Sequence, residues 1–213
     1  MQEIHLAALL ASHLCHDLTG PVGAVNNGVE PLMEETDEDI RRQSLELVEM
    51  SAGEANRRLT FFRLAFSAAG GLQATISLSD ARRVALDFFE GRKVDLEWPE
   101  TLGTGLQLSS AAVRLLLNLL LLAAESLPRG GRVTALIDGT GPWMAGARTE
   151  GVGVFLREAD RAVLDGTLAE EALDARTAQP AYAAAVAASI GSAIEHVSAE
   201  KSLLLSVEVP DGH

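Results

Sequence analysis

The first seventy residues carry apolar residues at intervals that alternate between three and four, and this spacing restricts how they can fold. The first series consists of Ile4, Ala8, Ala11, Cys15, Leu18, Val22, Val25, Val29 and Leu32. After a polar break at 34–37, the second series consists of Leu45, Val48, Ala52, Ala55, Leu59, Phe62 and Phe66. Residues with this spacing share one side of an α-helix, as in the seam of a coiled coil. The two series therefore predict an antiparallel helical hairpin.

A single helical hairpin buries little apolar surface, so the apolar side of this one needs a partner. The simplest arrangement is a homodimer with twofold symmetry, in which two hairpins form a four-helix bundle. The alternative is that the hairpin packs on the C-terminal half of its own chain.

The pattern changes after the hairpin, where Gly70-Gly71 mark a joint, and we divide the chain into domains at 1–69 and 70–213. The strands expected in the second domain are Gln73–Leu78, Lys93–Trp98, Arg132–Ile137, Gly151–Arg157 and Ser202–Val209. The expected helices run from a cap at Ser79 or Asp80 to Phe89, from Ser109 or Ser110 onward, and from Ala181 to His196. Strands on one side and amphipathic helices on the other indicate a two-layer α/β sandwich. The whole chain is therefore assigned to the α+β class.

Composition excludes several kinds of partner. The net charge of −13 argues against nucleic acid and against an anionic membrane surface, both of which select clustered Lys and Arg. The single cysteine, Cys15, fits a reducing compartment, and no signal peptide is recognisable, so we expect a cytoplasmic protein. The most apolar stretch, Ala111–Leu127, includes Arg114, Asn118 and Glu125 and is predicted to be a buried helix rather than a membrane span.

His16 is the histidine whose position best suits chemistry. At about 100° per residue, it lies roughly 130° from the centre of the apolar stripe and therefore faces solvent. An exposed neutral imidazole is a good nucleophile and could accept a phosphoryl group and pass it to a carboxylate. Asp17 could orient the ring or take its proton, and Pro21 tends to kink the helix one turn further on. The ordinary alternative is a solvated surface histidine.

Two other chemistries fit the sequence around His16 poorly. Zinc would need more ligands, and although His13 is three residues back, no cysteine or third histidine is suitably placed. Thiol chemistry fails because adjacent helical residues diverge by about 100°, which puts Cys15 in the apolar seam and His16 outside it. No metal site is therefore expected.

The segment His16-Asp17-Leu18-Thr19-Gly20-Pro21 resembles the H-box of sensor histidine kinases, in which the histidine is phosphorylated. The longer strings LCHDLTGPVGAVNNGVE and RLTFFRLAFSAAG closely resemble the ChpT-type histidine phosphotransferases of alphaproteobacteria. The resemblance is strong over the hairpin and looser over the rest of the chain. It implies a catalytic His16 with Asp17 beside it, on a hairpin for dimerisation and histidine phosphotransfer.

The C-terminal domain is similar in layout to the ATP-binding domain of histidine kinases, but its nucleotide residues differ. The string RLLLNLLLLAAESLPRGGRV resembles the kinase N-box, with Asn118 at its first asparagine and Leu122 where kinases have the asparagine that helps to hold Mg²⁺. Leucine offers no oxygen to a hard cation. The segment 138–141, DGTG, directly follows a strand and is expected to be a tight turn rather than an adenine-binding box. We therefore expect a degenerate kinase-like domain without ATP.

The resemblance implies a dimeric histidine phosphotransferase in a two-component phosphorelay. His16 would receive a phosphoryl group from an aspartate on the receiver domain of a hybrid histidine kinase and pass it to response-regulator receiver domains. The receiver's acidic pocket would supply Mg²⁺, so the chain needs no cofactor of its own. The alternatives are an active ATP-dependent sensor histidine kinase core and a non-catalytic dimeric scaffold.

The hairpin geometry adds an expectation about partner binding. If Glu34 and Ile40 flank the turn, the numbers of facing residues sum to about 74, which puts Arg57 and Arg58 level with His16. One of them could neutralise the phosphoryl group or dock the receiver, or both could be ordinary solvated arginines. The C-terminal domain is expected to offer a second docking surface.

Overall fold

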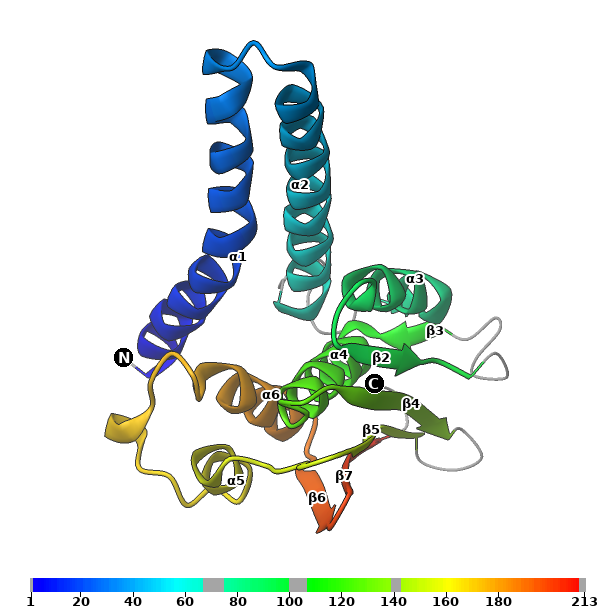
Figure 1. The fold of residues 1–213 in the computed structure, drawn as a ribbon. Coiled ribbons are helices and arrows are strands. Elements are labelled where there is room, and N and C mark those ends of the chain that lie inside the picture. Colours follow the sequence, from blue (N-terminus) through cyan, green and yellow to red (C-terminus); the bar gives the residue numbers. More distant parts are fainter. Residues whose placement is uncertain (1, 67–74, 100–106, 139–142, 211–213) are drawn as a thin grey trace.

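The computed structural model describes residues 2–66, 75–99, 107–138 and 143–210. Two long antiparallel helices, α1 (Gln2–Glu34) and α2 (Glu38–Phe66), stand on the rest of the chain as an upright hairpin (Figure 1). The lower part of α1 contacts α6, while the lower part of α2 contacts α3 and α4. The helical hairpin expected from the alternating repeat is therefore present.

The α/β part contains two sheets and a layer of helices. The strands of the larger sheet, in spatial order, are β2 (Val94–Glu97), β4 (Gly131–Asp138), β5 (Trp143–Gly151), β7 (Ser202–Val209) and β6 (Ile194–Ala199). Only the β2–β4 pair among these is parallel. The smaller sheet pairs β1 (Thr75–Ser77) with β3 (Gln107–Ser109). The helical segments are α3 (Leu78–Phe89), α4 (Ser110–Glu125), α5 (Glu158–Leu164), η1 (Glu170–Ala172) and α6 (Ala178–Ser189). This arrangement confirms the α+β class.

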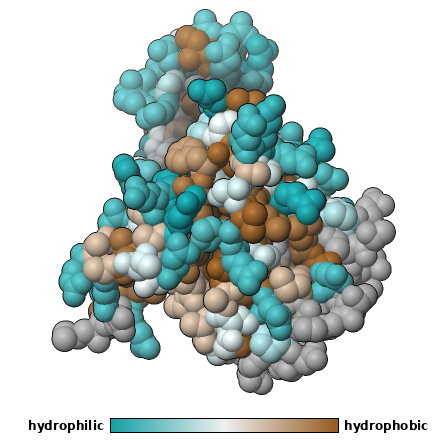
Figure 2. Space-filling view, turned by 90° about the horizontal axis from the view of Figure 1, so that it is seen from below, coloured by the Kyte–Doolittle hydropathy of each residue, from teal (hydrophilic) through white to brown (hydrophobic). Residues whose placement is uncertain are grey.

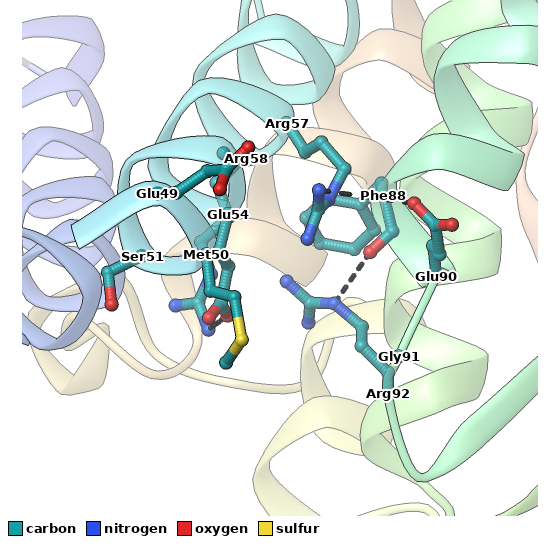
Figure 3. A pocket seen from close by; sticks show the side chains of 11 residues that line it. Glu49, Met50, Ser51, Glu54, Arg57, Arg58, Phe88, Glu90, Gly91 and Arg92 are labelled. Carbon is teal, nitrogen blue, oxygen red and sulfur yellow. Dashed lines mark hydrogen bonds and ion pairs between the residues drawn. The ribbon is translucent and has the colours of Figure 1, made fainter. Parts of the chain in front are cut away.

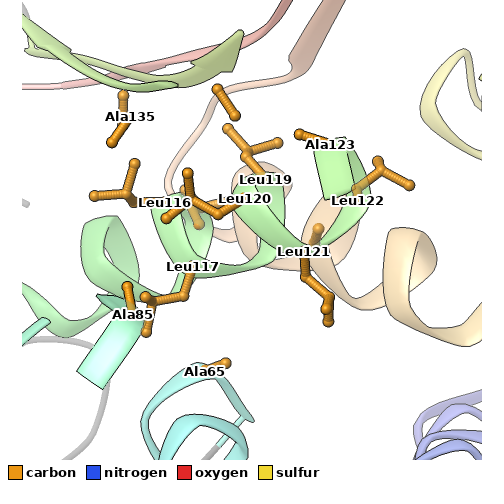
Figure 4. Close-up of a cluster of buried hydrophobic side chains, with 14 of the residues drawn as sticks. Ala65, Ala85, Leu116, Leu117, Leu119, Leu120, Leu121, Leu122, Ala123 and Ala135 are labelled. Carbon is orange, nitrogen blue, oxygen red and sulfur yellow. The ribbon is translucent and has the colours of Figure 1, made fainter. Parts of the chain in front are cut away.

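Helix α4 is the centre of the molecule, and every residue from Ser110 to Ala123 is buried. It packs on the sheet with one side and on the helices with the other, so Leu116 lies toward Ala135 of β4 while Leu117 lies beside Ala85 of α3 (Figure 4). Ser109 begins the helix by accepting a hydrogen bond from the amide of Ala112 at 3.1 Å. In the described residues no helix is long and apolar enough to cross a membrane.

The lower end of α2 joins the hairpin to this core through aromatic packing. Phe61, Phe62 and Ala65 are buried, and the ring of Phe61 stacks on Phe88 of α3 with centroids 4.0 Å apart. The upper part is covered less: Val29 of α1 is 42% exposed, and Leu45 on the facing helix is 57% exposed. The hairpin thus packs on its own C-terminal half only at its base.

The two helices approach closely at Gly28. A Cβ atom there would lie 2.7 Å from Cγ2 of Val48 and 3.0 Å from the carbonyl oxygen of Ser44. Glycine therefore permits the tight contact that holds the helices together above the base.

Two sequence-based predictions in the α/β part are wrong. The strand predicted at Gly151–Arg157 is absent, because β5 ends at Gly151, a turn with Gly153 at φ +71° follows, and Arg157 caps α5. The helix predicted at Ala181–His196 starts earlier and ends at Ser189, after which a turn at Gly191 with φ +76° leads into β6.

The sequence also predicts no strand at β3 and no helix at α5 or η1, whereas the other predicted elements differ only at their ends. Helix α3 begins at Leu78 with Ser77 as its N-cap, a few residues before the expected Ser79 or Asp80. The strands expected at Lys93–Trp98, Arg132–Ile137 and Ser202–Val209 are present as β2, β4 and β7. The joint at Gly70-Gly71 and the 139–141 part of the DGTG turn lie outside the described residues.

Apolar side chains also reach the surface of the α/β part. The face seen from below carries apolar patches among hydrophilic side chains (Figure 2). The exposed apolar side chains of this part include Val152 and Phe155, which follow β5, at 61% and 52% exposure. Val197 of β6 is 63% exposed.

Candidate functional site

His16 lies on α1 with 89% of its side-chain surface exposed, as the stripe geometry predicts. Its Nδ1 atom is 3.4 Å from Oδ1 of Asp17. A hydrogen on Nδ1 directed at this carboxylate leaves Nε2 as the unprotonated nitrogen. The arrangement therefore suits nucleophilic attack by Nε2 from the solvent side.

Asp17 lies between two histidines. Its second oxygen, Oδ2, is 3.9 Å from Nε2 of His13, and the His13 side chain is only 13% exposed. The buried Nε2 of His13 has no hydrogen-bond partner among the described residues. In the described part of the chain, no group of three or more histidine, cysteine, aspartate or glutamate side chains is arranged to hold a metal ion.

Arg58 of α2 reaches across to α1 at the level of His16. Its Nη1 donates a hydrogen bond to the backbone carbonyl of Asp17, and its Nη2 lies 2.5 Å from Oε1 of Glu54. The facing register expected from the hairpin turn is therefore confirmed at this pair. Pro21, four residues after Asp17, has no N–H to donate to the same carbonyl.

These residues line an open groove between the two helices, which we call the His16 groove. Its volume is about 550 Å³. Its walls are His16, Asp17, Thr19, Gly20, Pro21 and Ala24 from α1 and Ser51, Glu54 and Arg58 from α2. The groove thus places the exposed His16 imidazole beside one cation and two carboxylates.

A second cavity of about 650 Å³ shares Ser51, Glu54 and Arg58 with the first and extends to the end of α3. We call it the arginine pocket, because Arg57, Arg58 and Arg92 line it (Figure 3). Nη1 of Arg57 lies 3.9 Å from Oε2 of Glu90.

Arg92 enters this pocket from the turn between α3 and β2. Its guanidinium lies 3.8 Å from the centroid of the Phe88 ring, and its Nε donates to the Phe88 carbonyl at 2.7 Å (Figure 3). Burial, followed by the nearby Arg58 cation, lowers the pKa of Arg92. A partly buried cation with cationic neighbours is a favourable place for an anion.

The sequence did not reveal Arg92 as a site residue. It belongs to no motif, and only the packing of α3 against α2 brings it beside Arg57 and Arg58. The Glu90-Gly91 turn just before it, with Gly91 at φ +71°, is the one local sign that the chain changes direction there.

Asn118 has a structural part in this fold. Its Nδ2 donates to the carbonyls of Ala65 in α2 and Arg114 in α4, at 3.1 and 2.8 Å. Gln179 of α6 donates in turn to both oxygens of Asn118, at 2.9 Å. Leu122, one turn further along α4, is 1% exposed and contributes only to the apolar core. Asn118 therefore ties three helices together.

The family model for the histidine phosphotransferase C-terminal domain matches residues 78–202, more than half of the chain. The chain belongs to the histidine phosphotransferase family. It is 35% identical to protein phosphotransferase ChpT of Brucella abortus (strain 2308), over 98% of this chain and 97% of that one. It also matches a solved structure of a bacterial phosphotransferase with a TM-score of 0.83 and 32% identity, covering 96% of each chain.

These matches confirm the family and the phosphotransferase class expected from the longer strings LCHDLTGPVGAVNNGVE and RLTFFRLAFSAAG. The segment matched by the C-terminal domain model begins at α3, after the hairpin. The similarity to ChpT covers nearly the whole chain, so this histidine phosphotransferase shares both the hairpin and the α/β part with its relative.

Proposed function

We propose that this histidine phosphotransferase carries a phosphoryl group on His16 between receiver domains of a phosphorelay. The observation that supports this most is the exposed His16 imidazole, whose Nδ1 lies 3.4 Å from the Asp17 carboxylate at the edge of a groove. Exposure lets a large partner approach Nε2, and the carboxylate holds the ring in the tautomer that leaves Nε2 free. His13, beside the same carboxylate, lacks this exposure.

In the proposed step, the Nε2 lone pair of His16 attacks the phosphorus of an aspartyl phosphate on a hybrid-kinase receiver. The bond from phosphorus to the aspartate oxygen breaks, and the carboxylate leaves with the electron pair. The imidazole gains positive charge, which the Asp17 carboxylate stabilises through Nδ1–H. The reverse step then delivers the phosphoryl group to the aspartate of a response-regulator receiver.

Of the two arginines that the hairpin register suggests for receiver docking, Arg57 meets the receiver in this proposal, together with Arg92, whereas both terminal nitrogens of Arg58 already have partners within the hairpin. The receiver's phosphorylation site is acidic, so cations beside the His16 groove favour its approach. Arg92 belongs to the α/β part, which supports the expectation that this part adds a second docking surface. We expect Arg92→Ala to raise the receiver concentration needed for half-maximal transfer, and an unchanged value would remove Arg92 from this surface.

The functional form is a homodimer in which two hairpins make a four-helix bundle. The apolar residues left exposed on both helices support this, among them Val22 and Val29 on α1 and Leu45 and Leu59 on α2. Light scattering should then give twice the mass of one 22.5 kDa chain. A monomer mass at micromolar concentration would contradict this arrangement.

The relay proceeds without ATP or a metal of its own in this proposal, because Leu122 takes the place of a Mg²⁺-binding asparagine and lies in the core. Mg²⁺ comes with the receiver. The lone Cys15 is compatible with a cytoplasmic setting.

The test uses a panel of receiver domains from the organism that makes this chain, each labelled with ³²P-acetyl phosphate and then mixed with the full-length protein. We expect acid-labile label on the wild type and on His5→Ala, a control histidine exposed on the same helix, and none on His16→Ala. No label from any receiver would overturn the proposal. Label from ³²P-ATP alone would instead favour a kinase, and label that survives His16→Ala would favour another acceptor.

A further inference from the structure

Pro21 removes a backbone hydrogen bond next to the reactive histidine. In a regular α-helix the amide of residue 21 donates to the carbonyl of residue 17, and proline has no such amide. The carbonyl of Asp17 receives a hydrogen bond from Nη1 of Arg58 instead. We infer that Arg58 is a positioning residue, which replaces the hydrogen bond that Pro21 removes and thereby holds the backbone of His16-Asp17 in its reactive geometry.

The geometry around Arg58 favours this role over contact with a phosphoryl group. Its second terminal nitrogen, Nη2, is paired with Glu54 one turn earlier on α2, at 2.5 Å. The side chain is 22% exposed, and each terminal nitrogen already has a partner on one of the two helices. A cation whose charge is already matched by Glu54 has less attraction left for a phosphate.

The neighbouring arginines have different partners. Arg57 approaches Glu90 across the arginine pocket, and Arg92 is held by Phe88. Arg41, near the hairpin turn, donates to the carbonyls of Leu32 and Glu35 at the end of α1. Among these four arginines, Arg58 is the one directed at the carbonyl opposite Pro21. Arg57 and Arg92 are therefore placed to contact a receiver, whereas Arg58 positions the backbone of His16-Asp17.

The inference rests on the proposed function, and it predicts which kinetic quantity changes. A charged hydrogen bond is worth about tenfold in an equilibrium or rate. We therefore expect Arg58→Met to lower the saturating rate of phosphoryl transfer about tenfold, with the receiver concentration at half-maximal rate unchanged. Loss of a docking contact would raise that concentration and leave the saturating rate as it was.

The decisive variant restores the missing amide. In Pro21→Ala, the amide of residue 21 can donate to the Asp17 carbonyl, so Arg58 is no longer required there. We expect the double variant Pro21→Ala/Arg58→Met to recover most of the rate lost in Arg58→Met. Glu54→Gln keeps Arg58 but weakens its ion pair with residue 54. It should lower the transfer rate by less than Arg58→Met does, and Pro21→Ala should restore that rate as well. Arg63→Met, an exposed arginine of α2, is the control.

The rates use the receiver that labels the wild type most strongly, and urea unfolding of the same variants gives a readout independent of transfer. The inference would be overturned if Arg58→Met caused the same loss of rate and of unfolding midpoint with and without Pro21→Ala. It would also be overturned if Arg58→Met changed only the receiver concentration at half-maximal rate. If Arg58→Met fails to fold, Glu54→Gln with and without Pro21→Ala decides. If the wild type accepts no phosphoryl group, the proposed function fails, while the unfolding measurements still test the hydrogen bond.

Discussion

The hairpin and the α/β part both contain many apolar side chains, but they bury them to very different extents. In α4 every side chain from Ser110 to Ala123 is buried, so sequence changes there act on the whole fold. In the hairpin, Leu59 is 52% exposed and the His16 side chain 89% exposed. The exposed His16 imidazole therefore lies where the chain is least enclosed by its own side chains, whereas the buried core that stabilises the fold lies in the α/β part.

A matched pair of leucine truncations gives the strongest test of this difference in burial. Leu119→Ala in α4 removes a fully buried side chain and should lower the free energy of unfolding by about 3 kcal/mol. Leu59→Ala should lower it by less than about 1 kcal/mol within one chain, because half of its side chain is exposed. Urea unfolding at low protein concentration, where the monomer predominates, measures both.

The same pair should have the reverse order in assembly. Leu59→Ala is expected to weaken the dimer in light-scattering dilution series, and Leu119→Ala to leave its dissociation unchanged. Equal stability costs for the two leucines, or no effect of Leu59→Ala on dimer dissociation, would show that the two regions do not differ in the way described.

A second prediction concerns the link between the regions. Asn118→Ala removes the side-chain donor to the buried carbonyl of Ala65 and one of the two acceptors of the Gln179 amide, so we expect a loss of about 2 kcal/mol in unfolding free energy. Asn56→Ala, at an exposed asparagine of α2, is the matched control. Hydrogen exchange should show faster exchange at the base of α2 in Asn118→Ala. A stability equal to that of the control would mean that aromatic packing alone joins the hairpin to the core.

The smallest expected effect is a pH dependence at the end of α4. Burial raises the pKa of Glu125 to about 7, against the opposing effect of Arg157, whose Nη2 lies 3.0 Å from the carboxylate. A carboxyl whose pKa is higher in the folded state binds a proton more readily there, so its contribution to stability falls as pH rises from about 4.5 to about 7. Glu125→Gln should therefore flatten the wild-type decline in urea midpoint over this range, and Glu46→Gln should not. Parallel curves for wild type and Glu125→Gln would contradict this.

The hairpin was predictable because its information is local. An alternating repeat over two long segments specifies the helices, their apolar seam and their register together. The numbers of facing residues sum to about 74, and this rule alone puts Arg58 level with His16, as the contact of Arg58 with Asp17 confirms. The long apolar helix was predictable for the same reason. The pairing of Arg58 with the Asp17 carbonyl was not, since it depends on side-chain direction across two helices.

Strand β5 is misplaced and β6 is missed when only the sequence is considered, because pairing with distant strands, rather than local sequence, decides which segments become strands there. The buried residues of β5 are small, such as Ala145 and Ala147, whereas VGVF at 152–155, just after it, has stronger strand formers. Pairing of β5 with both β4 and β7 decides in favour of the weaker segment. Strand β6 was missed similarly, because an alanine-rich helix precedes it and its partner β7 lies later in the chain.

The central claim is that His16 carries the phosphoryl group, and peptide mapping tests it most directly. The protein labelled by a phosphorylated receiver would be digested under mildly alkaline conditions, where phosphohistidine survives, and fragmented by tandem mass spectrometry. The account predicts a single phosphorylated peptide with the modification on His16. A phosphoryl group on His13 or on any other residue would contradict it. So would transfer that proceeds with no phosphorylated residue on this chain.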